Sequence, residues 1–151
     1  MKRLFAAAFA LAFLSLISPS ETRAVETKQA RPYYDISKEV TLNGTVSSVL
    51  TKPSKGMLPG SHLLVKTPYG AVDASLGRFG LQGKGALTIE AGRQVEVTGV
   101  MKTLKGKQVF VTRNVKVDGQ VYTMRNQHGI PVSPQARARA NEKTAQKGVL
   151  L

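Results

Sequence analysis

The chain has 151 residues, with 22 Lys and Arg against 9 Asp and Glu, and a formal net charge of +13. It contains no Cys, which excludes disulfide bonds, thiol catalysis and thiolate metal ligands. Its length suits one domain with a core of its own, held together by apolar burial and backbone pairing alone.

The first 24 residues have the layout of a secretory signal peptide. Lys2 and Arg3 form a short positive segment, residues 4–17 are apolar and uncharged, and residues 22–24 (Thr-Arg-Ala) offer a cleavage site. A membrane anchor is the alternative, but the apolar run is shorter than the roughly 20 residues that span a bilayer. We therefore expect cleavage after Ala24, export to the periplasm or the exterior, and no transmembrane segment afterwards.

The chain after this leader divides into three parts by composition. Residues 25–37 are polar and are expected to form an N-terminal arm. Residues 38–132 carry alternating apolar and polar side chains separated by Gly-rich and Pro-rich turns, which is typical of a β domain. Residues 133–151 form a basic tail without an apolar face, which predicts a frayed helix or disorder.

Within the domain, the alternation predicts five strands and a short sixth. The first, residues 40–46, places Val40, Leu42 and Val46 on one face with Gly44 between them. A Pro- and Gly-rich loop follows at residues 51–60, and a Gly-rich segment at residues 77–92 favours a short helix or a loop. The further strands are predicted at residues 61–67, 71–76, 93–104, 107–117 and 120–124.

This order of elements predicts an all-β fold, a small five- to six-stranded OB-like Greek-key barrel with a short helix or loop between strands three and four. Gly44 and Gly99 lie inside the first and fourth strands, where closing a small barrel demands strong coiling. A β-sandwich is the structural alternative.

Three segments resemble the secreted bacterial OB-fold (BOF) proteins and other short exported OB-like domains of unknown function. They are "VTLNGTV" at residues 40–46, "EAGRQVEVTGVM" at 90–101 and "VFVTRNVKV" at 109–117, so the resemblance covers residues 38–118. It implies export and a small barrel without a known catalytic site. The loop at 51–60 and the extension at 120–132 depart from the family pattern.

No motif in the sequence indicates catalysis or a cofactor. There is no Gly-x-Ser-x-Gly elbow and no P-loop, and the two histidines have no ligand-spaced partners. The glycines of "GRFGLQGKG" (residues 77–85) favour turns over a phosphate site. We therefore expect a protein that is not an enzyme and that uses no cofactor.

His62 and Asp73 are predicted on the outer face of the second and third strands, with Lys66 beside them. That face is the usual ligand face of an OB-fold, so His62 and Asp73 are candidate polar contacts for a ligand. The alternatives are a metal site that uses His62 and His128, or a surface histidine that only pairs with Asp73.

The fourth and fifth strands carry most of the basic residues of the domain. The hypothesis is a surface for an anionic envelope component or a small anionic ligand, made by Lys66, Arg78, Lys102, Lys105, Lys107 and Arg113. The alternative is that these charges only keep edge strands from aggregating. We do not expect nucleic acid as a partner, because aromatic side chains are few and the expected export would separate the chain from the nucleic acid of the cell. The sequence thus predicts an exported, monomeric, non-catalytic binding module of the cell envelope.

Overall fold

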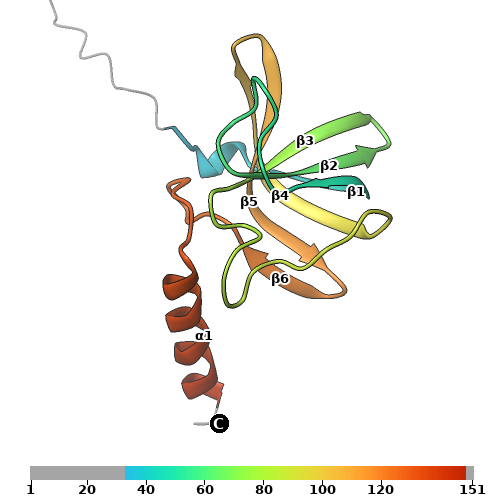
Figure 1. The fold of residues 1–151 in the computed structure, drawn as a ribbon. Coiled ribbons are helices and arrows are strands. Elements are labelled where there is room, and N and C mark those ends of the chain that lie inside the picture. The colour runs from blue at the N-terminus through green and yellow to red at the C-terminus, as the bar shows by residue number, and fades with distance from the viewer. Residues whose placement is uncertain (1–32, 149–151) are drawn as a thin grey trace, which may run out of the picture. The chain divides into compact units, whose positions relative to one another are not determined.

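Six strands form one continuous sheet that closes on itself in the computed structural model, which describes residues 33–148 (Figure 1). The expected signal peptide lies outside these residues. A short 3-10 helix, η1 (Ile36–Lys38), comes first, and a helix, α1 (Pro134–Gly148), comes last. The strands are β1 (Val40–Leu50), β2 (Ser61–Thr67), β3 (Gly70–Gly77), β4 (Gln94–Leu104), β5 (Lys107–Val117) and β6 (Gln120–Thr123).

The order of the strands confirms the predicted small barrel. Neighbours follow β3-β2-β1-β4-β5-β6, all antiparallel, and a parallel contact of β3 with β5 closes the first five strands into a ring. The closing contact is short: it pairs Ala74 with Phe110 and Ser75 with Val111. The same edge of β5 pairs with β6 further along, so β6 is an addition to the barrel. The sequence predicts either a short helix or a loop between β3 and β4, and the structure has a loop with turns there.

Two tight turns connect the last three strands. Lys105 and Gly106 join β4 to β5, and Asp118 and Gly119 join β5 to β6. All four residues have positive φ, between 49° and 78°. This is the conformation of the two-residue hairpin turn whose twist matches that of the flanking strands. The break in the alternation at Lys105-Gly106 therefore marks a hairpin, as the sequence predicts.

The strong coiling of β4 and β5 occurs at a β-bulge beside Gly99. The pairing passes from Thr98–Asn114 to Gly99–Thr112, so Arg113 has no partner on β4. A Cβ at Gly99 would lie 2.2 Å from the carbonyl oxygen of Val111, which leaves no room for a side chain. The register of the β4–β5 pairing therefore changes at Arg113, and the bulge is the cause.

The barrel interior holds the main apolar core. Leu63, Val65, Ala74, Leu76 and Phe110 are fully buried in it, with valines of β1, β4 and β5 around them. Val40 shares the face of Leu42 and Val46 but is 47% exposed; it is the first residue of β1, where β1 pairs with β4 and not yet with β2.

A second, smaller cluster lies on the other side of the sheet. It consists of Tyr34, Val100 and Val111, with Leu58 packed against it. Val111 and Phe110 are neighbours on β5, and adjacent side chains of a strand point to opposite faces. Val111 is therefore buried outside the main core, where Tyr34 and Leu58 cover the outer surface of β4 and β5.

The segment after β6 returns to the barrel. The backbone N–H groups of Met124 and Arg125 donate to the carbonyl oxygen of Arg113 at the bulge, and Arg125 forms a bridge with Pro131. Asn126 closes the turn between them, because its Oδ1 accepts from the backbone N–H groups of His128 and Ile130. The extension at residues 120–132 is thus an ordered part of the domain.

The helix α1 is attached to the domain through Arg137 in its first turn. The Arg137 side chain is buried and donates to the carbonyl oxygens of Phe79 (2.7 Å) and Gln82 (2.8 Å) in the loop after β3. Burial lowers the pKa of this guanidinium below its usual value. Within residues 33–148, no helix is both long and apolar enough to cross a membrane.

Candidate functional site

His62 lies on the outer face of β2, as predicted, but it is fully buried rather than exposed. Its Nδ1 lies 2.6 Å from Oδ1 of Asp73, and its Nε2 lies 2.8 Å from the carbonyl oxygen of Leu58. A carboxylate and a carbonyl only accept hydrogen bonds, so both ring nitrogens must carry a proton to satisfy this geometry. His62 is therefore positioned as an imidazolium that joins Asp73 on β3 to the loop at residues 51–60.

The pKa of His62 reflects two opposing effects. Burial lowers the pKa, because it disfavours the charged ring, but the hydrogen bonds to Asp73 and to the carbonyl of Leu58 outweigh burial and raise the pKa above 6.5. The sequence predicts the pairing with Asp73 but not the burial. The cover comes from Leu58 in the loop and from Arg125 after β6, and neither has a periodicity that a sequence pattern can show.

The metal hypothesis gains no support from this arrangement. A metal ion at His62 would have to displace Asp73 or Leu58 from a ring nitrogen. His128 lies in the exposed turn after Asn126, with its backbone N–H bound to Asn126 Oδ1. Across residues 33–148, no three His, Cys, Asp or Glu side chains gather in a way that would hold a metal ion.

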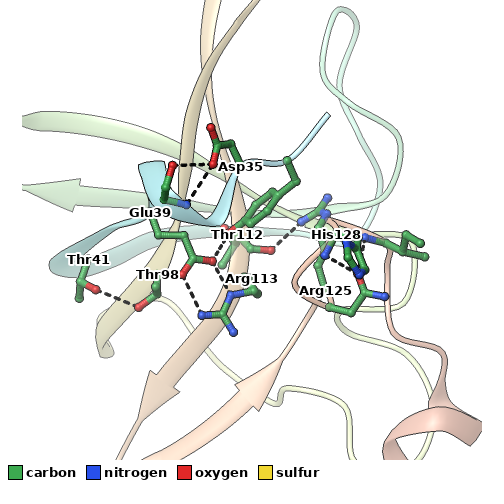
Figure 2. Close-up of polar contacts among 12 residues, drawn as sticks. Asp35, Glu39, Thr41, Thr98, Thr112, Arg113, Arg125 and His128 are labelled. Atoms are coloured by element: carbon green, nitrogen blue, oxygen red, sulfur yellow. Dashed lines mark hydrogen bonds and ion pairs between the residues drawn. The ribbon is translucent and has the colours of Figure 1, made fainter. Parts of the chain in front are cut away.

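Arg125 is the functional candidate that the sequence does not reveal. Only 4% of it is exposed. Its Nη1 donates to the carbonyl oxygens of Ser75 (2.6 Å) on β3 and of Thr112 (2.8 Å) on β5, and its Nη2 to Oγ of Ser75 (3.1 Å); Figure 2 shows it beside Thr112. It therefore bridges the two strands next to the short contact that closes the barrel.

Arg125 has no acidic partner among the described residues, where the ion pairs involve other side chains. Burial lowers its pKa below the usual value for arginine. A buried cation that is held only by neutral acceptors is costly, and such groups mark sites where an anion can bind.

Arg113, a predicted anion contact, is already paired. Its guanidinium donates to both carboxylate oxygens of Glu39, with Nη2 at 2.8 Å from Oε2, and the Tyr34 hydroxyl donates to the same carboxylate at 2.6 Å (Figure 2). The hydrogen bonds from Arg113 are the main reason why the pKa of Glu39 falls below its usual range. Arg113 thus holds the start of β1 to the bulge of β5 and is not free for a ligand.

The other predicted cations differ in exposure. Lys105 and Lys107 are exposed at the β4–β5 turn, whereas Lys102 is half-buried with its ammonium 4.5 Å from the centre of the Tyr33 ring. Lys66 is exposed on β2 beside the β2–β3 turn, and Arg78 is exposed just after β3. The six predicted residues are thus distributed over β2, the loop after β3 and the β4–β5 hairpin, and Arg113 is paired with Glu39.

The structure adds two lysines that the sequence analysis did not select. Lys52 and Lys55 are exposed in the loop at residues 51–60, which lies beside the β4–β5 turn (Figure 1). A Cβ at Gly56 would lie 3.2 Å from Nζ of Lys107. The two segments enclose a groove of about 450 Å³. We call the exposed side chains of Lys52, Lys55, Lys105 and Lys107 the basic loop surface.

The basic loop surface has no acidic side chain within the two segments that form it. Neither residues 51–60 nor residues 101–109 contain Asp or Glu. These lysines form none of the ion pairs found in the described residues, and their positive charge attracts an approaching anion.

Comparison with known proteins identifies the family of the barrel. A comparison with curated proteins finds no match. The model of the MamS/MamX magnetosome protein family matches residues 38–122, which run from the last residue of η1 into β6 and exclude Arg125. This match covers more than half of the chain, and the chain therefore belongs to the MamS/MamX magnetosome protein family.

Proposed function

We propose that the chain is an exported, non-catalytic binding module that works at the magnetosome or in the cell envelope around it. In this proposal, the basic loop surface contacts an anionic component of that compartment. Family membership supports the location, and the observation that carries the binding role is the presence of four exposed lysines on two neighbouring segments that contain no acid.

The position of these lysines on the barrel supports the same role. In OB-folds, the β1–β2 and β4–β5 loops flank the usual ligand face. Here these loops are residues 51–60 and the Lys105-Gly106 turn. The proposal therefore includes the finer assignment of the barrel to the OB-fold proteins that the sequence resembles.

The geometry of His62 supports a role without catalysis. An aspartate–histidine pair can serve a nucleophile, but only through the imidazole nitrogen that faces away from the carboxylate. In this chain, that nitrogen is Nε2, and the carbonyl oxygen of Leu58 occupies it. The pair is placed to hold the loop at residues 51–60 on the barrel.

An anionic lipid surface is the first partner to test. Each lysine close to such a surface contributes about 1 kcal/mol of binding free energy, and salt screens the contribution. We expect the protein without its leader to sediment with vesicles that contain phosphatidylglycerol at low salt, and to be released as salt rises. Vesicles of phosphatidylcholine alone should leave it in solution.

Two matched double variants locate the contact. Lys105→Asn with Lys107→Gln removes two charges from the basic loop surface, and Asn tolerates the positive φ of residue 105. Lys84→Gln with Lys116→Gln removes two exposed charges elsewhere. We expect the first variant to bind roughly tenfold more weakly or worse, and the second to bind nearly as well as the wild type.

Three outcomes would count against the proposal in different ways. Equal losses in both variants would reject the basic loop surface as the contact. Retention on heparin without vesicle binding would replace the lipid surface by an anionic polymer. No retention on either at low salt would reject the anionic partner altogether.

A further inference from the structure

A second recess of the domain combines apolar walls with two arginines. It has a volume of about 430 Å³ and opens between the loop at residues 51–60, the start of the loop after β3, and the segment at 125–131. Leu58, Phe79 and Ile130 line it together with Arg78 and Arg125. A volume of this size, an apolar lining and few polar groups are typical of sites for small molecules.

Arg125 offers this pocket one free edge of its guanidinium. Arginine has five N–H donors, and both of those on Nη1 and one on Nη2 are used. The remaining two, on Nε and Nη2, belong to the same side of the planar group and have no acceptor among the described residues. Gly77 also lines the pocket, and its lack of a side chain leaves the space beside Arg125 open, because a Cβ at residue 77 would lie 3.1 Å from Nη2 of Arg125.

The rim of the pocket carries the second cation and an uncovered apolar side chain. Arg78 is exposed and has no ion pair within the described part of the chain. Ile130 is 60% exposed. No residue that lines the pocket is acidic, so both guanidinium groups lack a negative partner beside an apolar wall.

We propose that this pocket binds a carboxylate carried on an apolar body. The free edge of Arg125 presents two parallel N–H donors, which match the two oxygens of a carboxylate. A phosphate dianion has more acceptor oxygens than this edge can satisfy. Arg78 attracts the same charge at the entrance, and the apolar body lies against Leu58, Phe79 and Ile130.

This inference goes beyond the proposed function and depends on other residues. None of the four lysines of the basic loop surface lines the pocket, although Lys52 and Lys55 lie in the loop that contributes Leu58 to it. The family match also ends before Arg125. Loss of vesicle binding would therefore leave the pocket proposal standing, and loss of carboxylate binding would leave the basic loop surface standing.

The test is a titration of the ¹⁵N-labelled protein, followed by amide chemical shifts, with hexanoate and with 1-hexanol. We expect hexanoate to shift amides at residues 58, 77–79 and 125–130, and to bind at least tenfold more tightly than the neutral alcohol. N-acetyl-phenylalanine and its amide form a second pair, which distinguishes a peptide carboxyl terminus from a free alkyl acid as the source of the carboxylate.

Variants separate the charge from the apolar wall. Arg78→Gln should weaken hexanoate binding about fivefold, whereas Lys84→Gln, which removes an exposed charge from the same loop, should leave it unchanged. Ile130→Ser should weaken hexanoate and hexanol alike. These three side chains are on the surface, so their replacement tests the pocket even if a change at Arg125 prevents folding.

The proposal is overturned if hexanoate and hexanol bind equally, if the shifted amides lie away from these segments, or if Arg78→Gln and Lys84→Gln behave alike.

Discussion

At the scale of single residues, His62 links the protonation of one ring to the position of one loop. Below its ordinary pKa of 6.5, the ring is charged in both the folded and the unfolded chain. Because folding raises the pKa, the stabilisation is complete at low pH and is lost as pH rises through the folded value. A neutral ring lacks one proton and leaves either Asp73 or the carbonyl of Leu58 without a donor.

We predict that His62→Gln lowers the free energy of unfolding by about 2 kcal/mol at pH 5.5, and by less at pH 8.5. Urea unfolding of both proteins across this range measures the difference. His128→Gln is the control, because its exposed ring makes no buried contact. Parallel stability curves for wild type and His62→Gln would show that the ring does not hold the loop as an imidazolium.

At the scale of elements, the β4–β5 and β5–β6 hairpins each depend on a glycine, for different reasons. Gly99 lies at the bulge, where a Cβ would lie 2.2 Å from the oxygen of Val111 and 2.9 Å from Cα of Thr112. Gly119, in the next turn, has no atom within 4 Å of an added Cβ but has a φ of 78°. The first glycine avoids a collision, and the second permits a left-handed conformation.

We predict that Gly99→Ala lowers the free energy of unfolding by about 3 kcal/mol, because strands held by a full ladder cannot move apart without losing pairs. Gly119→Ala should cost only about 1 kcal/mol, the usual penalty for Ala in a left-handed conformation. Urea midpoints compare the two variants. If Gly99→Ala were no more destabilising than Gly119→Ala, the bulge would be able to widen.

The strands were predictable from the sequence because their signals are local. Alternation and turn residues predict β2 and β5 with the bounds that the structure has, and the barrel follows from the number of strands and their order. The cover of the outer face was not predictable. Leu58, Tyr34 and Arg125 reach it from irregular segments, and only their three-dimensional contacts explain why His62, Ser75 and Val111 are buried.

The candidate site shows the same division. Lys105 and Lys107 could be selected because a short hairpin turn exposes its residues, but their neighbours Lys52 and Lys55 belong to a loop whose path the sequence does not reveal. The sequence could not show that Arg113 is already paired with Glu39. The two residues lie far apart in the chain, and the pairing of β1, β4 and β5 brings them together.

At the scale of the whole molecule, one side chain after the last strand completes the closure of the barrel. The parallel contact of β3 with β5 has only two residue pairs. Arg125 adds two hydrogen bonds across the same seam, to the carbonyls of Ser75 and Thr112, both residues fully buried. Without it, both buried carbonyls would lose the donor that Arg125 provides.

We predict that Arg125→Met lowers the free energy of unfolding by about 2–4 kcal/mol, since two buried carbonyls lose their donors. The opposing effect is relief from burying an unpaired charge, which favours the apolar residue. We expect the lost donors to dominate, because Met fills the space but cannot donate. The free energy of unfolding of Arg125→Lys should lie between those of the wild type and Arg125→Met, because an ammonium group keeps the charge but cannot donate to both carbonyls in the geometry of a planar guanidinium.

Hydrogen exchange distinguishes loss of the seam from general loosening. Amides of β3 and β5 near Ser75 and Val111 should exchange faster in Arg125→Met, while those of the β1–β4 ladder keep their protection relative to global unfolding. If Arg125→Met were as stable as the wild type, the free energy lost by burying the charge of Arg125 would equal the stabilisation from its two hydrogen bonds to the carbonyls. Arg125 would then be kept for its free edge in the pocket, and the closure of the barrel would be due to strand pairing alone.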